Sequence, residues 1–239
     1  MCAFPLARLL VHPRGVRHMI DPSKLWEGTC AVYGAERAYD LYGHLVPVPA
    51  ERIVPATDGL EVHLGSRLFR VFDTPGHARH HICIWDASAH AFFTGDTFGL
   101  SYRELDVDGR PFIMPTTTPT QFDPQAMHAS IDRMLAMQPH AMYLTHYSRV
   151  TDVERLGADL HRLIDTMVAV ASAARGTGVP RHVEILAGLE QIVREEAARQ
   201  NWALNEDETL ELLRMDLELN AQGLGVWLDS QPVVEAETA

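Results

Sequence analysis

The stretch Asp73-Thr74-Pro75-Gly76-His77 follows a short apolar run at Leu68–Phe72. The run is typical of a β-strand, and the Pro-Gly pair after it is typical of a tight turn. Two later segments share this design, because Phe93-Thr94-Gly95-Asp96-Thr97 and Leu144-Thr145-His146-Tyr147 each place a polar side chain just past a predicted strand. Strand ends converge on one rim of a sheet, so we expect the three segments to meet there although they are far apart in the sequence.

The side chains that these segments bring forward are His77, Asp96 and His146. A single histidine at a strand end is more often a hydrogen-bonded surface residue than a metal ligand. Two imidazoles and one carboxylate in one place suit zinc, with iron or manganese as alternatives. The three residues together therefore predict a site for one or two metal ions.

The order Thr-Pro-Gly-His, Phe-Thr-Gly-Asp and Leu-Thr-His resembles the later metal motifs of the metallo-β-lactamase superfamily. The resemblance runs from about His12 to Leu228, and its ending Asn220-Ala221-Gln222-Gly223 is similar to that of hydrolases related to hydroxyacylglutathione hydrolase. It implies an α/β protein, an αβ/βα sandwich with a two-metal site. His77 would bind the first metal and His146 the second, and Asp96, the implied catalytic residue, would bridge them. Hydroxide held by the metals would attack a small thioester, ester or lactone.

Substrate contacts are expected in the segment Thr97–Asp123, which lacks clear periodicity and is long for a connection. Tyr102, Arg103 and the run Thr116-Thr117-Thr118 are candidates for orienting the substrate. Loop packing and turn capping are the alternative explanation for these residues.

One family motif is absent, because the sequence contains no H-x-H-x-D-H segment. His12, His18 and Asp21 have the wrong spacing and are interpreted as structural, and His80 and His81 match no ligand position. Each of two metals would then have two protein ligands, whereas catalytic zinc usually has three. We therefore expect weak or absent binding of a metal pair, with one ion shared by all three ligands as an alternative.

The predicted domain organisation is a metallo-β-lactamase-like domain at 1–150, lacking its N-terminal part and with an incomplete first sheet, and a C-terminal helical extension at 151–239. The chain begins inside what resembles a strand, Leu6–His12, so a truncated gene model or a natural truncation is expected. The remaining elements are a helix at 21–43, strands at 60–64, 68–72, 82–85, 91–93 and 141–144, and helices beginning near 124, 151, 182 and 207. A capping box is predicted at Thr151–Glu154.

Composition narrows the function further. The 32 acidic and 20 basic residues give a net charge of −12, which disfavours nucleic acid as a partner. Three cysteines without a C-x-x-C pair favour a reducing, cytoplasmic setting, and no stretch is long enough to span a membrane. A small-molecule substrate is expected, and exposed sheet edges make a homo-oligomer an alternative to a monomer. Two further functions stay open: a phosphodiesterase, or a non-catalytic remnant that acts as a binding or oligomerising module.

Overall fold

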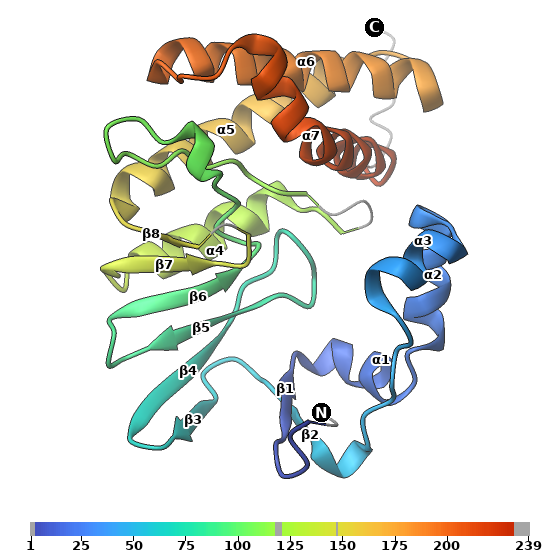
Figure 1. The fold of residues 1–239 in the computed structure, drawn as a ribbon, viewed down its shortest axis with the longest axis vertical. Coiled ribbons are helices and arrows are strands. Elements are labelled where there is room, and N and C mark those ends of the chain that lie inside the picture. The colour runs from blue at the N-terminus through green and yellow to red at the C-terminus, as the bar shows by residue number, and fades with distance from the viewer. Residues whose placement is uncertain (1–2, 118–120, 147, 232–239) are drawn as a thin grey trace, which may run out of the picture. The chain divides into compact units, whose positions relative to one another are not determined.

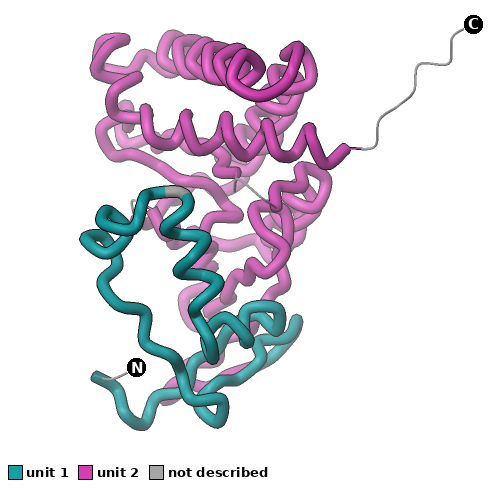
Figure 2. The backbone as a smooth tube through the Cα atoms, turned by 90° about the vertical axis from the view of Figure 1, so that its right-hand side faces the viewer, with its two compact units in different colours: residues 1–60 teal, residues 61–239 magenta. Residues whose placement is uncertain are grey.

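The computed structural model describes residues 3–117, 121–146 and 148–231, and divides into two compact units at residues 1–60 and 61–239 (Figure 2). The predicted division between residues 150 and 151 falls inside the second unit and stays a prediction. Thr118 and Tyr147, two residues of the predicted site segments, lie outside the described residues. No described helix is both long enough and apolar enough to cross a bilayer.

The first unit contains a two-stranded parallel sheet and three α-helices. Its elements in chain order are β1 Leu9–Val11, the 3₁₀ turn Pro13–Gly15, α1 Val16–Ile20, α2 Ser23–Tyr33, α3 Ala35–Tyr42, the 3₁₀ turn Ala50–Arg52 and β2 Ile53–Pro55. The single helix predicted at 21–43 is wrong in one respect, because it is two helices. Gly34 separates them with a φ of 78°, a left-handed conformation that interrupts helical hydrogen bonding.

The second unit is built on a six-stranded sheet with strand order β3-β4-β5-β6-β7-β8 (Figure 1). The strands are β3 Glu61–Leu64, β4 Arg67–Asp73, β5 Ile82–Asp86, β6 Ala91–Gly95, β7 Ala141–Leu144 and β8 Arg149–Val150. All neighbours are antiparallel except β6 and β7, which are parallel. The crossover between these two contains the long connection and helix α4, Pro124–Leu135. The strands β3 to β7 were each predicted to within one or two residues of their ends.

The C-terminal part is helical, as predicted, with α5 Val153–Ala173, α6 Gly178–Gln200 and α7 Glu206–Asp229. The three helices gather at the β8 end of the sheet (Figure 1). The core continues from the sheet into these helices through Phe92, Leu160 and Leu213, each fully buried.

The helix starts illustrate how local sequence signals succeed and fail. Asp123 caps α4 as predicted, because its carboxylate accepts the N–H of Ala126 at 3.0 Å. The capping box predicted at Thr151–Glu154 does not form, since Asp152 is the N-cap in a left-handed conformation and its side chain makes no capping bond. A capping box occurs instead at α7, between Asn205 and Glu208.

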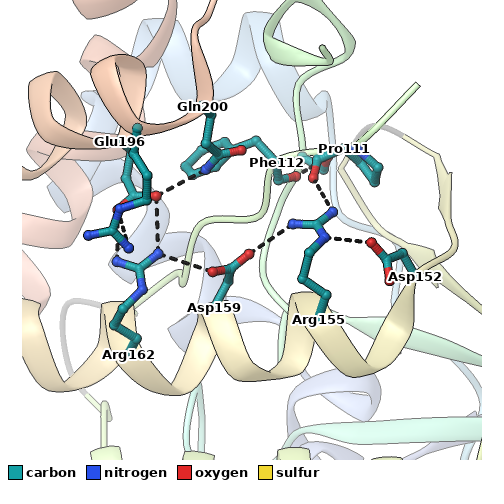
Figure 3. A network of polar contacts seen from close by, with 10 residues as sticks. Pro111, Phe112, Asp152, Arg155, Asp159, Arg162, Glu196 and Gln200 are labelled. Carbon is teal, nitrogen blue, oxygen red and sulfur yellow. Dashed lines mark hydrogen bonds and ion pairs between the residues drawn. The ribbon is translucent and has the colours of Figure 1, made fainter. Parts of the chain in front are cut away.

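A polar network ties the long connection to the C-terminal helices (Figure 3). Arg155 of α5 donates to the carbonyl of Pro111 at 2.9 Å. Two turns further on, Arg162 makes a two-pronged contact with Glu196 of α6, at 2.7 and 3.1 Å. Glu196 is 2% exposed, so losing Arg162 would remove the nearest cation from a buried charge and leave it Arg199 at 3.6 Å and a hydrogen bond from Gln200.

Candidate metal centre

The centre of the candidate site is Asp96, which follows β6 and faces a histidine with each carboxylate oxygen. Oδ2 lies 3.5 Å from Nε2 of His77, and Oδ1 lies 3.5 Å from Nε2 of His146. His77 follows β4 and His146 follows β7, so three strand ends bring together the three residues that the sequence predicts. The structure therefore places His77, Asp96 and His146 next to one another, as expected for residues at one rim of a sheet. Their role as metal ligands stays a prediction.

The turn before Asp96 depends on Gly95, whose φ is 50°. A Cβ at this position would lie 2.3 Å from Nε2 of His81, so only glycine leaves room for that ring. His81 uses the space: its Nε2 accepts the backbone N–H of Asp96 at 3.0 Å, and its Nδ1 lies 2.8 Å from the Thr97 hydroxyl. His81 therefore supports the backbone of Asp96 through these contacts, and the expectation that it matches no ligand position stays a prediction.

His77 is held in one orientation by Thr116. Its Nδ1 lies 3.0 Å from the Thr116 carbonyl oxygen and 2.8 Å from the Thr116 hydroxyl. A carbonyl can only accept a hydrogen bond, so Nδ1 carries the proton and Nε2 presents a lone pair. Burial lowers the pKa of His77, and the nearby Asp96 carboxylate opposes this effect. The neutral ring is the form that binds metals.

These contacts test whether a metal ion fits. With Nδ1 protonated, the lone pair of His77 Nε2 and an oxygen of Asp96 face each other at 3.5 Å, an unfavourable arrangement without a cation between them. Two donors bound to one tetrahedral zinc at about 2.1 Å lie about 3.4 Å apart, which matches this spacing. Asp96 Oδ1 is also buried and has no hydrogen-bond partner among the described residues. The donor set therefore fits metal ions.

The arrangement supplies two pairs of donors and not one complete set. Among residues 3–117, 121–146 and 148–231, no group of three or more His, Cys, Asp or Glu side chains could hold a single ion. The geometry favours one ion beside each Asp96 oxygen over one ion shared by all three residues. Two protein ligands per ion is one fewer than catalytic zinc usually has.

Among the described residues, those predicted to contact the substrate make contacts with other residues of the protein. Tyr102 is 7% exposed and donates its hydroxyl to Asp216 of α7 at 2.5 Å. Arg103 is engaged beside it, with an ion pair to Asp106 at 3.2 Å and a hydrogen bond to the Ser101 hydroxyl. Their contact with substrate stays a prediction. Thr116 and Thr117 have structural contacts in the described chain, to His77 and to Asn220 respectively.

Helix α7 contributes two side chains to this region that the sequence reasoning missed. Burial raises the pKa of Asp216, while the hydrogen bond from Tyr102 and the positive potential of His146 oppose the rise. One turn later, Asn220 is 2% exposed and bonds the segment at 115–117. Asn220 was noted only as part of a family-like ending, and the helical spacing of the two residues was the available signal.

The histidines near the chain start have structural contacts. Nδ1 of His12 accepts the N–H of Arg14 at 3.1 Å, and Asp21 accepts hydrogen bonds from Ser23. His80 lies with Nδ1 3.2 Å from the side-chain oxygen of Gln121. The interpretation of His12, His18 and Asp21 as structural stays a prediction, and so does the absence of a ligand role for His80.

Comparison with known proteins gives a family match and a shared fold. The model of the metallo-beta-lactamase superfamily matches residues 6–146. The metallo-beta-lactamase fold-containing protein ST1585 of Sulfurisphaera tokodaii is 28% identical over 109 residues, which cover 45% of this chain and 38% of that protein. The match thus spans well under two thirds of this relative.

Two solved structures, each with a TM-score above 0.5, support the fold. The crystal structure of ST1585 from Sulfolobus tokodaii aligns over 91% of this chain and 70% of the ST1585 chain, with 22% identity and a TM-score of 0.59. The structure of TTHA1429 of Thermus thermophilus, a metallo-beta-lactamase family protein, aligns over 87% of this chain and 67% of the TTHA1429 chain, with 18% identity and a TM-score of 0.52. A structure of TTHA1623 in a di-iron-bound form aligns over 64% of this chain and 61% of the TTHA1623 chain, with 27% identity and a TM-score of 0.38.

Proposed function

Because the chain belongs to the metallo-beta-lactamase superfamily, we propose that it is a metal-dependent hydrolase of a small thioester, ester or lactone. The family's fold is of the metal-dependent hydrolase type. The observation that carries the proposal is the position of Asp96, whose two oxygens each face one histidine Nε2 at 3.5 Å. That spacing is too long for a good hydrogen bond and suits two donors of one ion.

Each of the two ions would be held by a pair of ligands: one ion by His77 and Asp96, and the other by His146 and Asp96. Zinc is the proposed metal, and iron or manganese would suit the same donors. When bound, such ions supply Lewis-acid polarisation of an acyl carbonyl and make water acidic enough to react near neutral pH. The chain's own residues do the positioning: Thr116 orients His77, and His81 holds the backbone of Asp96.

A cavity of about 340 Å³ is a candidate for the part of the substrate away from the reacting bond. It is lined by Arg79, Gln121 and Trp227, among others, and Arg79 lies on the segment that also carries His77. Its volume is at the lower end of the range of small-molecule pockets, about 300–1,000 Å³. Arg79 favours a substrate with an acidic group. The net charge of −12 disfavours nucleic acid as the substrate, and a cytoplasmic setting is part of the proposal.

The test combines metal content with turnover. The purified protein is analysed for bound zinc, iron and manganese, and is then assayed with a thioester, an ester, a lactone and a phosphodiester. We expect metal-dependent cleavage of an acyl substrate that the His77→Ala variant loses. As a matched control, His63→Ala removes a histidine from β3 and should retain it.

Two results would replace this proposal. Cleavage of the phosphodiester alone would make the protein a phosphodiesterase. A folded protein without metal or turnover would favour the non-catalytic module.

A further inference from the structure

Asn220 of α7 is buried among backbone groups of the long connection between β6 and α4. Its side-chain oxygen accepts the N–H of Thr117 at 2.7 Å, and its side-chain nitrogen donates to the carbonyl of Pro115 at 3.1 Å. The hydroxyl of Thr117 also donates to the backbone carbonyl of Asn220 at 3.3 Å. One amide thus satisfies a donor and an acceptor on either side of Thr116.

Thr116, enclosed between these two bonds, is the residue that orients His77. Its carbonyl oxygen and its hydroxyl lie 3.0 and 2.8 Å from His77 Nδ1. The direction of this carbonyl determines which imidazole nitrogen carries the proton, and therefore whether Nε2 can present its lone pair towards Asp96. Rotation of the 115–117 backbone would remove that constraint.

We propose that Asn220 is a positioning residue of the metal centre, acting through the 115–117 backbone to keep His77 Nε2 available for a metal ion. This inference rests on the metal-binding part of the proposed function and not on hydrolysis. A side-chain amide is required because it donates and accepts at once. An aspartate at this position keeps the acceptor for Thr117, loses the donor for Pro115 and adds a buried charge.

The alternative is that Asn220 only stabilises α7, and a second asparagine in the same helix separates the two. Asn205 caps the N-terminus of α7 and accepts the N–H of Glu208 at 3.0 Å. Asn205→Ala should lower the temperature of thermal unfolding without changing the contacts of the 115–117 segment. It is therefore a matched control for loss of helix stability.

The experiment compares wild type, Asn220→Asp, Asn220→Ala and Asn205→Ala by thermal unfolding and by titration with cobalt(II), whose visible absorption reports the ligands. We expect both Asn220 variants to bind cobalt about 10- to 100-fold more weakly than wild type with an altered spectrum. Asn205→Ala should keep wild-type affinity and spectrum. Wild-type cobalt binding in both Asn220 variants, or an equal loss in Asn205→Ala, would overturn the inference.

A metal-free readout separates this inference from the proposed function. Nitrogen-15 NMR of the imidazoles, with the His77 signals identified by their absence in His77→Ala, shows which ring nitrogen is protonated. We expect Nδ1–H in wild type and in Asn205→Ala, and a mixture of forms in Asn220→Asp. If wild type binds no cobalt but shows this pattern, the proposed metal chemistry fails, and with it the link to a metal, while the orientation of His77 by Asn220 stands. An unchanged His77 in Asn220→Asp contradicts it.

Discussion

The histidines on the two sides of Asp96 differ in how far they are buried and held in one orientation. On one side, the His77 side chain is 12% exposed and bonded to Thr116, in a segment that Asn220 fixes from α7. On the other side, the His146 side chain is 53% exposed. Orientation is determined by the fold on the first side, so less conformational entropy is lost when an ion binds there. We therefore expect the ion beside His77 to bind first and the ion beside His146 to bind second.

The largest effect is expected from the ligand that both sides share. Asp96→Asn removes the negative charge between the two histidines and should abolish measurable zinc binding on both sides. Asp165→Asn is a matched control, because that carboxylate lies on α5, is 76% exposed and contacts His128 at 3.0 Å. Isothermal titration with zinc checks both variants. Tight zinc binding by Asp96→Asn would remove the basis for comparing the two sides.

The next effect tests the order of filling directly. His77→Ala should lower the affinity for the first zinc ion by at least about 10-fold. His146→Ala should lower this affinity less, because the first ion binds on the buried side. Titrations of the two variants under one set of conditions give the ratio. Equal losses would mean that burial and the Thr116 contact do not distinguish the sides.

The buried side also depends on close packing at Gly76, immediately before His77. Its φ is 135°, and a Cβ there would lie 2.3 Å from the backbone Cα of Met127 in α4. We expect Gly76→Ala to lower the free energy of unfolding by at least about 3 kcal/mol, because a backbone atom cannot move aside. Gly65→Ala, at a φ of 61° with open space around it, should cost about 1 kcal/mol. Urea unfolding compares the two, and similar costs would contradict the packing argument.

The smallest effect is a pH dependence. Burial lowers the pKa of His77 below its ordinary value of 6.5, so the unfolded chain takes up a proton at a higher pH than the folded one. Stability of the metal-free protein should therefore fall as the pH drops from about 6.5 towards the lowered value. His77→Gln should reduce this slope, measured as the unfolding free energy in chelator-containing buffers. Identical slopes in the two proteins would show that His77 is not buried as described.

Sequence reasoning reached the residues whose position follows from strand ends. His77, Asp96 and His146 each come directly after a predicted strand, and sheet geometry is regular enough to bring such positions together. Asn220 was out of reach as a support, because its contact with Thr117 joins residues 103 positions apart through tertiary packing. The same limit applies at Asp152, where a left-handed backbone replaces the capping geometry that its sequence favours.

The most direct test of the metal centre is to soak crystals of the protein in zinc and to locate the ions by anomalous diffraction. We expect the strongest peak to lie between His77 Nε2 and Asp96 Oδ2, within about 2.2 Å of both atoms. A second, weaker peak is expected beside His146. No peak at Asp96, or a peak beside His146 that fills before the one beside His77, would contradict the proposed metal centre.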